Sequence, residues 1–286
     1  MRSIAAVSIL ALALAAPHAA QAQGGAPAPV IAPENVLDGD RLTIGAGAVY
    51  GPSYEGSDDN VFSPFPLIQG SVRGVGINPR PGGAALDLVP DGRDAKVGLQ
   101  IGPLATYSGN RRRQIEDPVV RNAGRLKAAI DLGVNAGFSI KRLLNAYDAL
   151  TVSADAKWNV NEAHRGAVIT PQISYATPIS RGALVVVGAS AKHVDNAYAD
   201  YYYSVSPAQN QGSGLPLFQA RGGWVSYGGN ALVAVDLDGD LTNGGFAVFA
   251  LGSYSRLRGD AKRTPYTALR GDADQWNGAL GVAYTF

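Results

Sequence analysis

The most constraining feature of this sequence is a strict alternation of apolar and polar side chains over residues 125–141. The even-numbered positions from Leu126 to Ile140 are apolar, whereas Asp131 and other polar or small residues hold the odd-numbered positions. A period of two kept over this length requires an extended strand, because only there do neighbouring side chains face opposite sides. The same pattern recurs over residues 96–107, 148–160, 167–175 and 276–286.

Long alternating strands predict an all-β fold, a transmembrane antiparallel β-barrel. Strands of soluble sandwiches usually have about 5–6 residues, whereas a strand that crosses a membrane needs about 9–11. A closed barrel also satisfies every backbone polar group in lipid, which an open sheet cannot do. The apolar faces begin or end in aromatic residues, as the interfacial girdles of such barrels do: Tyr50, Tyr107, Trp158, Tyr175 and Trp276.

The N-terminus has the features of a secretory signal peptide over residues 1–22. Arg2 supplies the positive charge, and the apolar run over residues 4–16 is too short to span a bilayer. Ala20 and Ala22 fit the small-residue rule for cleavage after residue 22. Residues 23–40 then form a flexible periplasmic lead-in, and residues 41–286 form the barrel. Export together with a barrel predicts the outer membrane of a Gram-negative bacterium.

Loop lengths predict ten strands. Outer-membrane barrels place long loops outside and short turns in the periplasm, and both termini lie in the periplasm when the strand number is even. Ten strands place all four long polar segments outside: 51–61, 108–124, 195–216 and 256–275. Residues 62–89 and 217–238 are ambiguous. If both form hairpins, the count is twelve, but two long loops then become periplasmic.

The C-terminus matches the signal that the outer-membrane insertion machinery reads. The chain ends in Phe286, and apolar residues precede it at every second position. Such a strand presents an apolar face and a free edge to a templating partner. We therefore assign the barrel-insertion signal to Trp276, Leu280, Val282, Tyr284 and Phe286, and expect the insertion machinery, outer-membrane lipid and lipopolysaccharide as partners.

The sequence resembles the MipA/OmpV family of outer-membrane proteins. The resemblance spans most of the chain after residue 44 and rests on four segments in order: 45–59 with Pro64-Phe65-Pro66, 201–209, 213–216, and 253–261. It implies an outer-membrane barrel. The best-known member of the family is described as a scaffold that links a lytic transglycosylase to a peptidoglycan synthase, and other members as porin-like or adhesive.

Few residues suggest chemistry, so we expect no catalytic, cofactor-binding or metal site. The sequence has no Cys, which excludes thiol catalysis and disulfides. The formal net charge of +1 gives no basic field for nucleic acid. The pattern Asp236-x-Asp238-x-Asp240 lacks the Gly and Glu of a calcium loop and predicts a polar turn. His193 with Asp195 is the one dyad that an enzyme hypothesis would test.

Two outer-loop clusters have a structural and a binding interpretation. Arg111-Arg112-Arg113 is followed by two acidic residues and predicts a solvated loop, with contact to surface polysaccharide phosphates as the alternative. Tyr198 and the run Tyr201-Tyr202-Tyr203 predict loop packing or an interfacial girdle rather than a ligand cage.

The alternation also predicts an inner-wall ion pair. Both strands 125–141 and 148–160 carry their polar residues at odd positions, so residue numbers of paired positions must have an even sum. A turn centred on residue 144 places Asp131 opposite Lys157 inside the barrel. Such opposed charges contribute about 0.2–1 kcal/mol.

Three classes of function follow from these features. A non-catalytic envelope scaffold follows from the family resemblance. A small porin-like channel or a surface adhesin is the alternative, because the inner face is polar. An enzyme is the third class, and it depends on His193 and Asp195 alone.

Overall fold

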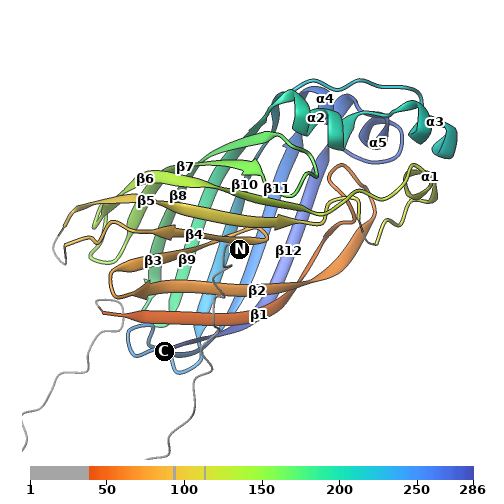
Figure 1. Cartoon of the computed structure of the whole chain (residues 1–286). Coiled ribbons are helices and arrows are strands. Elements are labelled where there is room, and N and C mark those ends of the chain that lie inside the picture. Colours follow the sequence, from red (N-terminus) through yellow and green to blue (C-terminus); the bar gives the residue numbers. More distant parts are fainter. Residues whose placement is uncertain (1–38, 93–94, 113) are drawn as a thin grey trace, which may run out of the picture. The chain divides into compact units, whose positions relative to one another are not determined.

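The computed structural model describes residues 39–92, 95–112 and 114–286, which form one closed antiparallel β-barrel (Figure 1). The predicted signal peptide, with Ala20 and Ala22, and nearly all of the predicted lead-in lie outside the described residues. Strands follow one another around the barrel in chain order, and β1 closes it by pairing with β12. None of the described helices is long and apolar enough to cross a bilayer.

The twelve strands differ mainly in length. Ten of them are long, whereas β3 and β4 are shorter than a membrane-spanning strand needs to be. Their bounds are β1 Arg41–Pro52, β2 Asn60–Val72, β3 Val75–Arg80, β4 Gly83–Asp87, β5 Val97–Ser108, β6 Ala129–Lys141, β7 Ala149–Asn159, β8 Ala167–Ser180, β9 Ala183–Val194, β10 Gly223–Asp236, β11 Gly245–Leu257 and β12 Asp274–Thr285.

The prediction of ten strands is wrong, because the described chain forms twelve. The ambiguous segment 62–89 contributes to three strands, β2, β3 and β4, whereas 217–238 contributes only one, β10. A single extra hairpin adds two strands without moving any long loop to the other end of the barrel. The count of twelve was expected only if each ambiguous segment added one strand, and that arrangement would have placed two long loops in the periplasm. The structure instead adds both extra strands in segment 62–89, so the long loops stay outside.

The two faces of the strands follow the predicted alternation. Apolar side chains project outward and are exposed on β5 and β6, for example Leu99, Tyr107, Leu132 and Phe138. The residues assigned to the insertion signal also lie exposed on or next to β12: Trp276, Leu280, Val282, Tyr284 and Phe286. Because lipid surrounds the barrel, this exposure is the expected environment for them.

The register between β6 and β7 differs from the prediction by two residues. Asp131 lies opposite Asn159, and Gly133 lies opposite Lys157, so paired residue numbers sum to 290 rather than 288. The β6–β7 turn is therefore centred one residue later than residue 144. The even sum keeps Asp131 and Lys157 on the same, inner face, and Lys157 Nζ lies 3.5 Å from Asp131 Oδ2 across the diagonal.

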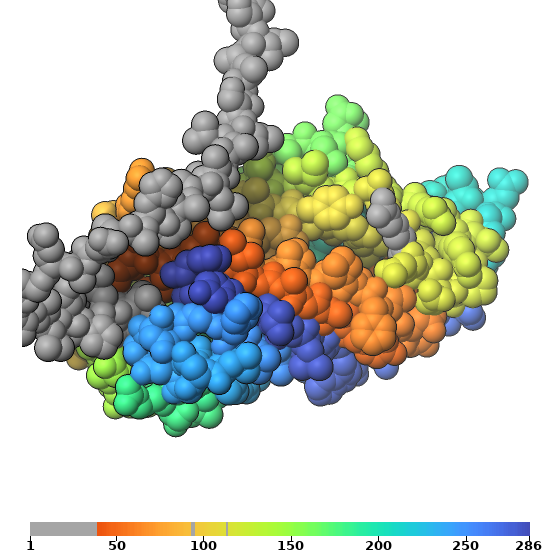
Figure 2. Space-filling view, turned by 90° about the horizontal axis from the view of Figure 1, so that it is seen from below, coloured from red at the N-terminus to blue at the C-terminus, as the bar shows by residue number. Residues whose placement is uncertain are grey.

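Strand β2 is paired unequally on its two sides. It pairs with β1 along its whole length, from Asn60 to Ser71, but with β3 only from Gly70 to Val72. Among the described residues its outer half has no partner strand on this side, and we call this the free edge; the Phe62 carbonyl there accepts the Gln114 side-chain amide at 3.2 Å. The space-filling view shows a hollow between the orange atoms of β2 and the yellow atoms at the outer end of β5 (Figure 2).

Two prolines explain how this edge is tolerated in lipid. The carbonyl of Leu42 accepts the N–H of Phe286, so even-numbered β1 residues bond toward β12 and odd-numbered ones toward β2. Odd β1 residues lie opposite odd β2 residues, which leaves even-numbered β2 residues directed at the free edge. Pro64 and Pro66 occupy two of these positions and have no N–H to leave unpaired.

Candidate functional site

A compact cap of packed loops lies at the outer end of the barrel. It is built from the loops between β1 and β2, β5 and β6, β9 and β10, and β11 and β12, and in Figure 1 its helices gather at the end opposite the C-terminus. Long loops mark this end as the extracellular one. The helices are α1 Pro118–Asn122, α2 Asn196–Tyr203, α3 Pro207–Ser213, α4 Gly259–Arg263 and α5 Pro265–Ala268.

Hydrogen bonds between different loops hold the cap together. Tyr54 Oη donates to the carbonyl oxygens of Tyr266 and Arg270 at 3.2 and 3.0 Å. Thr264 Oγ1 donates to the Tyr203 carbonyl at 2.6 Å, which joins α2 to the loop after β11. Buried apolar residues lie around these bonds, so the loops pack together as a small hydrophobic core. Such packing limits their independent movement.

The cap helix α2 carries three tyrosines that are buried in the cap. Asp195 caps the helix by accepting the N–H of Tyr198 at 2.9 Å. Tyr198, Tyr202 and Tyr203 are buried, and burial raises the pKa of each phenol. The imidazole of His164 packs against the Tyr198 and Tyr202 rings, with ring centroids 4.7 and 5.7 Å apart. The predicted tyrosine cluster is therefore a packed plug.

Two arginines, one in the β5–β6 loop and one in the β11–β12 loop, make contacts between loops of the cap. The buried guanidinium of Arg111 stacks on the Tyr266 ring, 3.7 Å from its centroid, and Nη1 donates to the Tyr202 carbonyl at 3.2 Å. Burial lowers the pKa of this arginine. Arg270 binds Asp117 with a shortest N–O distance of 2.6 Å. The first residue of the predicted basic run thus packs inside the cap.

A polar cluster lies on one side of the lumen beneath the plug; we call it the lumen ion cluster and define it as Arg80, Asp131, Asn135, Asp155 and Lys157. Arg80 at the end of β3 donates from Nε and Nη2 to Asp155 at 2.6 and 3.2 Å. Asn135 Nδ2 also donates to Asp155, at 2.5 Å. Charges here are paired by hydrogen bonds, as buried charges require.

Asp131 connects the lumen ion cluster to the plug. Its Oδ1 lies 2.9 Å from His164 Nε2, and His164 Nδ1 accepts the N–H of Gly166 at 3.1 Å. Lys157 Nζ donates to Thr106 Oγ1 at 2.9 Å. Farther out, Lys192 Nζ binds both Glu55 and the Tyr198 hydroxyl. The polar contacts thus continue from the wall into the cap.

The other side of the lumen is apolar. We call its residues the lumen apolar cluster, which consists of Phe65, Leu67, Ala234, Phe249 and Ala283. The Phe65 and Phe249 rings lie 5.9 Å apart, and Leu67, Phe249 and Ala283 are buried. These residues come from β2, β10, β11 and β12. The inner wall therefore combines a hydrogen-bonded side with a side closed by hydrocarbon.

The candidate catalytic dyad does not form. His193 lies on the outer face of the barrel, where its ring packs edge-on against Trp224 at 5.2 Å. Asp195 accepts the N–H groups of Tyr198 and Ala167 instead. In the turn that follows Asp236, the Asp236 carboxylate accepts the N–H groups of Asp238 and Gly239, so it is hydrogen-bonded within the turn. Within the described ranges, no group of three or more His, Asp or Glu is arranged to hold a metal ion.

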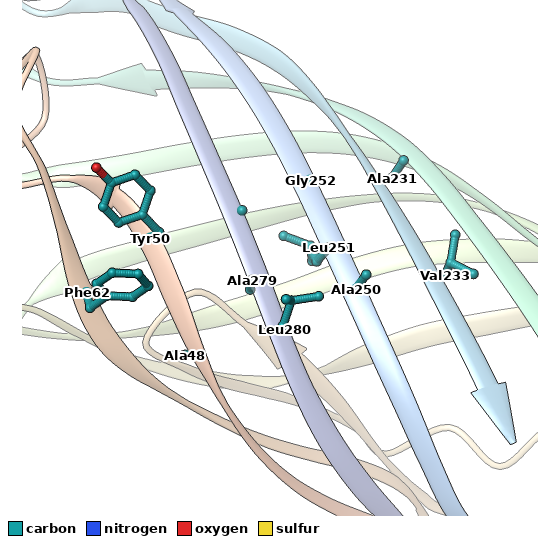
Figure 3. A pocket seen from close by; sticks show the side chains of 11 residues that line it. Ala48, Tyr50, Phe62, Ala231, Val233, Ala250, Leu251, Gly252, Ala279 and Leu280 are labelled. Carbon is teal, nitrogen blue, oxygen red and sulfur yellow. The ribbon is translucent and has the colours of Figure 1, made fainter. Parts of the chain in front are cut away.

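The outer face of the barrel also carries a shallow apolar hollow of about 510 Å³ (Figure 3). Tyr50, Phe62, Val233 and Leu280 are among the residues that line it, and none of its lining residues is charged. It lies on the lipid-facing side of β1, β2, β10, β11 and β12, where acyl chains are the natural contact.

At the periplasmic end, the β6–β7 turn is hydrogen-bonded internally and exposes apolar side chains. The buried carboxylate of Asp148 accepts the N–H groups of Leu143, Leu144 and Asn145 at 2.6, 2.8 and 3.2 Å. This arrangement presents Leu144, which is 80% exposed, together with exposed Leu143 and Tyr147. An ordered exposed apolar turn is a feature of interaction surfaces.

Sequence reasoning missed the free edge of β2 and the side of the lumen that is apolar. A signal for the edge was present, because Pro64 and Pro66 stand at alternate positions of one strand, and proline in sheets is confined to edges and bulges. No comparable signal marks the lumen apolar cluster, because β2 is apolar on both faces. The Asp148 turn gave no sequence signal beyond its length.

Together, a closed barrel with an apolar outer face, interfacial aromatic residues and long packed loops at one end define an outer-membrane β-barrel protein of a Gram-negative bacterium. The chain belongs to the family described as MltA-interacting protein MipA, whose model matches residues 44–286.

Solved structures give weaker likenesses. An outer membrane channel from Pseudomonas putida F1 is 14% identical, with a TM-score of 0.45 over 91% of this chain and 100% of that chain. The outer membrane protein OprD from Pseudomonas aeruginosa is 11% identical, with a TM-score of 0.33 over 86% and 65%. A Pseudomonas aeruginosa FadL homologue is 10% identical, with a TM-score of 0.30 over 86% and 89%. The search of curated proteins gave no match.

Proposed function

We propose that this protein is a non-catalytic scaffold of the outer membrane that binds murein-processing enzymes at its periplasmic end. The family description names an interaction with a partner, MltA, and a lytic transglycosylase and a peptidoglycan synthase are the partners that the family resemblance implies. The observation that carries the proposal is the packed cluster of buried tyrosines at the outer mouth. Tyr198, Tyr202 and Tyr203 are buried there, which supports a barrel that presents surfaces rather than a straight solute path.

The β6–β7 turn, with its internal hydrogen bonds, is the surface that we assign to the partner. Leu144 is held outward by the Asp148 hydrogen bonds, so binding would not require the turn to be ordered first. An exposed leucine at an interface centre contributes most when it enters an apolar pocket of the partner.

Co-purification tests this proposal directly. The full-length protein in detergent is immobilised and incubated with a purified lytic transglycosylase of the same bacterium. We expect capture by the wild type and at least about tenfold weaker capture by Leu144→Glu, because a charge replaces the apolar contact. The matched control is Leu217→Glu, which changes an exposed leucine of the outer loops and should bind like the wild type. No capture by wild type, or equal capture by both variants, contradicts the proposal.

A small channel is the second candidate, and a different observation favours it. Gln69, Ser190 and Asn230 have inward-facing positions, yet their side chains are exposed, so part of the lumen is open to water. The free edge of β2 also leaves the wall incompletely paired. Planar-bilayer recordings separate the two candidates: steady single-channel currents support the channel, and their absence at 200 mV supports a closed scaffold.

A further inference from the structure

A second surface feature is a groove at the outer rim of the barrel, which we call the rim groove. It lies where β5, β6 and the β7–β8 loop meet and has a volume of about 680 Å³. Its lining residues are Tyr107, Arg112, Arg125, Leu126, Lys127, Ala128, Ile130 and Asn161.

The position of the rim groove matches the headgroup level of the outer leaflet. Tyr107 and Ile130 are the last lipid-facing residues of β5 and β6, and both are about half exposed. Arg125 and Lys127 follow directly outside these strands, beyond the hydrocarbon. Tyrosine at this height is typical of the membrane–water interface. A molecule in the groove would therefore contact acyl chains below and water above.

The charge of the rim groove is positive and not neutralised. Three of its lining residues are cations and none is acidic. Arg112 Nη1 donates to Tyr107 Oη at 3.2 Å, and Lys127 Nζ donates to the Asn161 carbonyl at 2.5 Å, so both are positioned by neutral groups. In the part of the chain that the structure describes, Arg125 makes no ion pair.

Two acidic residues adjoin lining residues of the groove in the sequence, and both are engaged elsewhere. Asp131 on β6 faces the lumen and binds His164 and Asn159 there. Glu162, next to Asn161, pairs with Arg165 at 3.7 Å. The groove thus presents a surplus of positive charge to any ligand that enters from the membrane side.

We propose that the rim groove binds the phosphate groups of the phosphorylated glycolipid that forms the outer leaflet. Two guanidinium groups offer paired N–H donors that match phosphate oxygens, and the ammonium group adds a third cation. Tyr107 and Ile130 contact the first carbons of the acyl chains. The apolar hollow on the other arc of the barrel, with no charged lining residue, offers only the acyl contact and serves as the internal comparison.

The test measures glycolipid binding to the full-length protein in detergent micelles. The probes are bisphosphorylated lipid A, lipid A from which both phosphates have been removed, and inorganic phosphate. We expect the wild type to bind bisphosphorylated lipid A at least about tenfold more tightly than the dephosphorylated lipid, with an affinity that falls as salt increases. The triple variant Arg112→Gln, Arg125→Gln, Lys127→Gln should lose this preference.

The control variant is Lys262→Gln, which removes an exposed cation of α4 in the outer loops, outside the groove, and should retain binding. Heat-modifiable migration verifies that each variant forms a folded barrel. Equal affinity for both lipids, or a triple variant that binds like the wild type, overturns the proposal. Full displacement of the lipid by equimolar inorganic phosphate also overturns it, because the site would then select a free anion rather than a lipid.

Discussion

The lumen ion cluster and the lumen apolar cluster occupy the same kind of position, inward on different sides of one barrel, yet they are held together differently. Asp155 and Arg80 are fixed by directional bonds between strands that are far apart in the chain. Phe249 packs with Leu67 and Ala283, and its ring fills the space that a side chain at Gly281 would need. The difference teaches that an inward position in a barrel does not need to be polar, because hydrocarbon that fills the lumen is equally removed from water.

The largest expected effect lies in the lumen apolar cluster. Phe249→Ala should reduce the free energy of unfolding by about 4 kcal/mol, because a buried ring is replaced by a cavity that the rigid wall cannot close. Urea unfolding in detergent micelles, followed by tryptophan fluorescence, measures the change. Phe246→Ala removes a ring from the lipid-facing side of the same strand and should cost less than half as much. Equal costs would mean that the ring inside is no better packed than the ring outside.

The ion cluster should give the next largest effect. Asp155→Ala leaves the Arg80 guanidinium without its carboxylate and should cost about 3 kcal/mol in the free energy of unfolding. The double variant Arg80→Ala, Asp155→Ala should cost less than the single one, because no unpaired charge remains. Asp91→Ala breaks the more exposed pair with Lys141 and should cost under about 1 kcal/mol. A double variant less stable than Asp155→Ala would show that the pair itself, rather than the stranded charge, decides the stability.

A glycine of β12 tests whether the apolar side depends on shape. A Cβ on Gly281 would lie 2.4 Å from the Phe249 ring and 2.6 Å from the Ala46 carbonyl oxygen, so Gly281→Ala should cost about 2 kcal/mol. Part of this cost should disappear in a Phe249→Leu background, which relieves the ring contact. Gly278→Ala is the control on the same strand, because a Cβ there meets nothing within 4 Å. Similar losses for Gly281→Ala and Gly278→Ala would remove the argument from shape.

The smallest effect concerns an ion pair in the cap, outside both lumen clusters. Burial raises the pKa of Asp117, but hydrogen bonds from the Val120 N–H and the Arg270 guanidinium outweigh burial and hold the pKa below its ordinary value. The stabilisation is therefore complete above the unfolded pKa of about 4 and is lost as the pH falls through the lower folded value.

The expected loss is at most about 1 kcal/mol, because the Arg270 side chain is partly exposed. Protease cleavage of the outer loops after brief exposure to pH 6 or pH 3 measures it. Cleavage should increase at pH 3 in the wild type, and Arg270→Gln should reduce that difference. A variant with an unchanged pH dependence would place the titrating group elsewhere in the cap.

The same contrast explains how much of the fold the sequence reveals. Strands β6 and β7 alternate cleanly because Asp131, Asn135, Asp155 and Lys157 make the inner face polar, and their membrane-spanning character is therefore predictable. Strand β2 carries Phe65 and Leu67 inside and Phe62 and Ile68 outside, so alternation vanishes there. The short strands β3 and β4 fall below the spanning length, which is why the strand number was underestimated.

The candidate site was less predictable, because its contacts join distant segments. The sequence indicates a tyrosine cluster and a basic run, but it does not show that Arg111 stacks on Tyr266 or that His164 lies between Asp131 and α2. The predicted β6–β7 register is wrong by two residues, because the turn runs over residues 142–148 and is centred on residue 145 rather than on residue 144. The period of apolar side chains predicts which face of a strand points to lipid. It does not predict which loop residues contact each other, because those contacts join segments that are distant in the sequence.

The paired prolines of β2 have a consequence for the crowded plane of the membrane. An unpaired strand edge can normally pair with the strand edge of another copy, since its N–H groups are free to donate hydrogen bonds. Pro64 and Pro66 have no N–H to donate, so this edge is poorly suited to extend the sheet of one copy into that of another. The gap in the wall of the barrel therefore offers no N–H donor at these two positions for pairing with the sheet of a neighbouring copy.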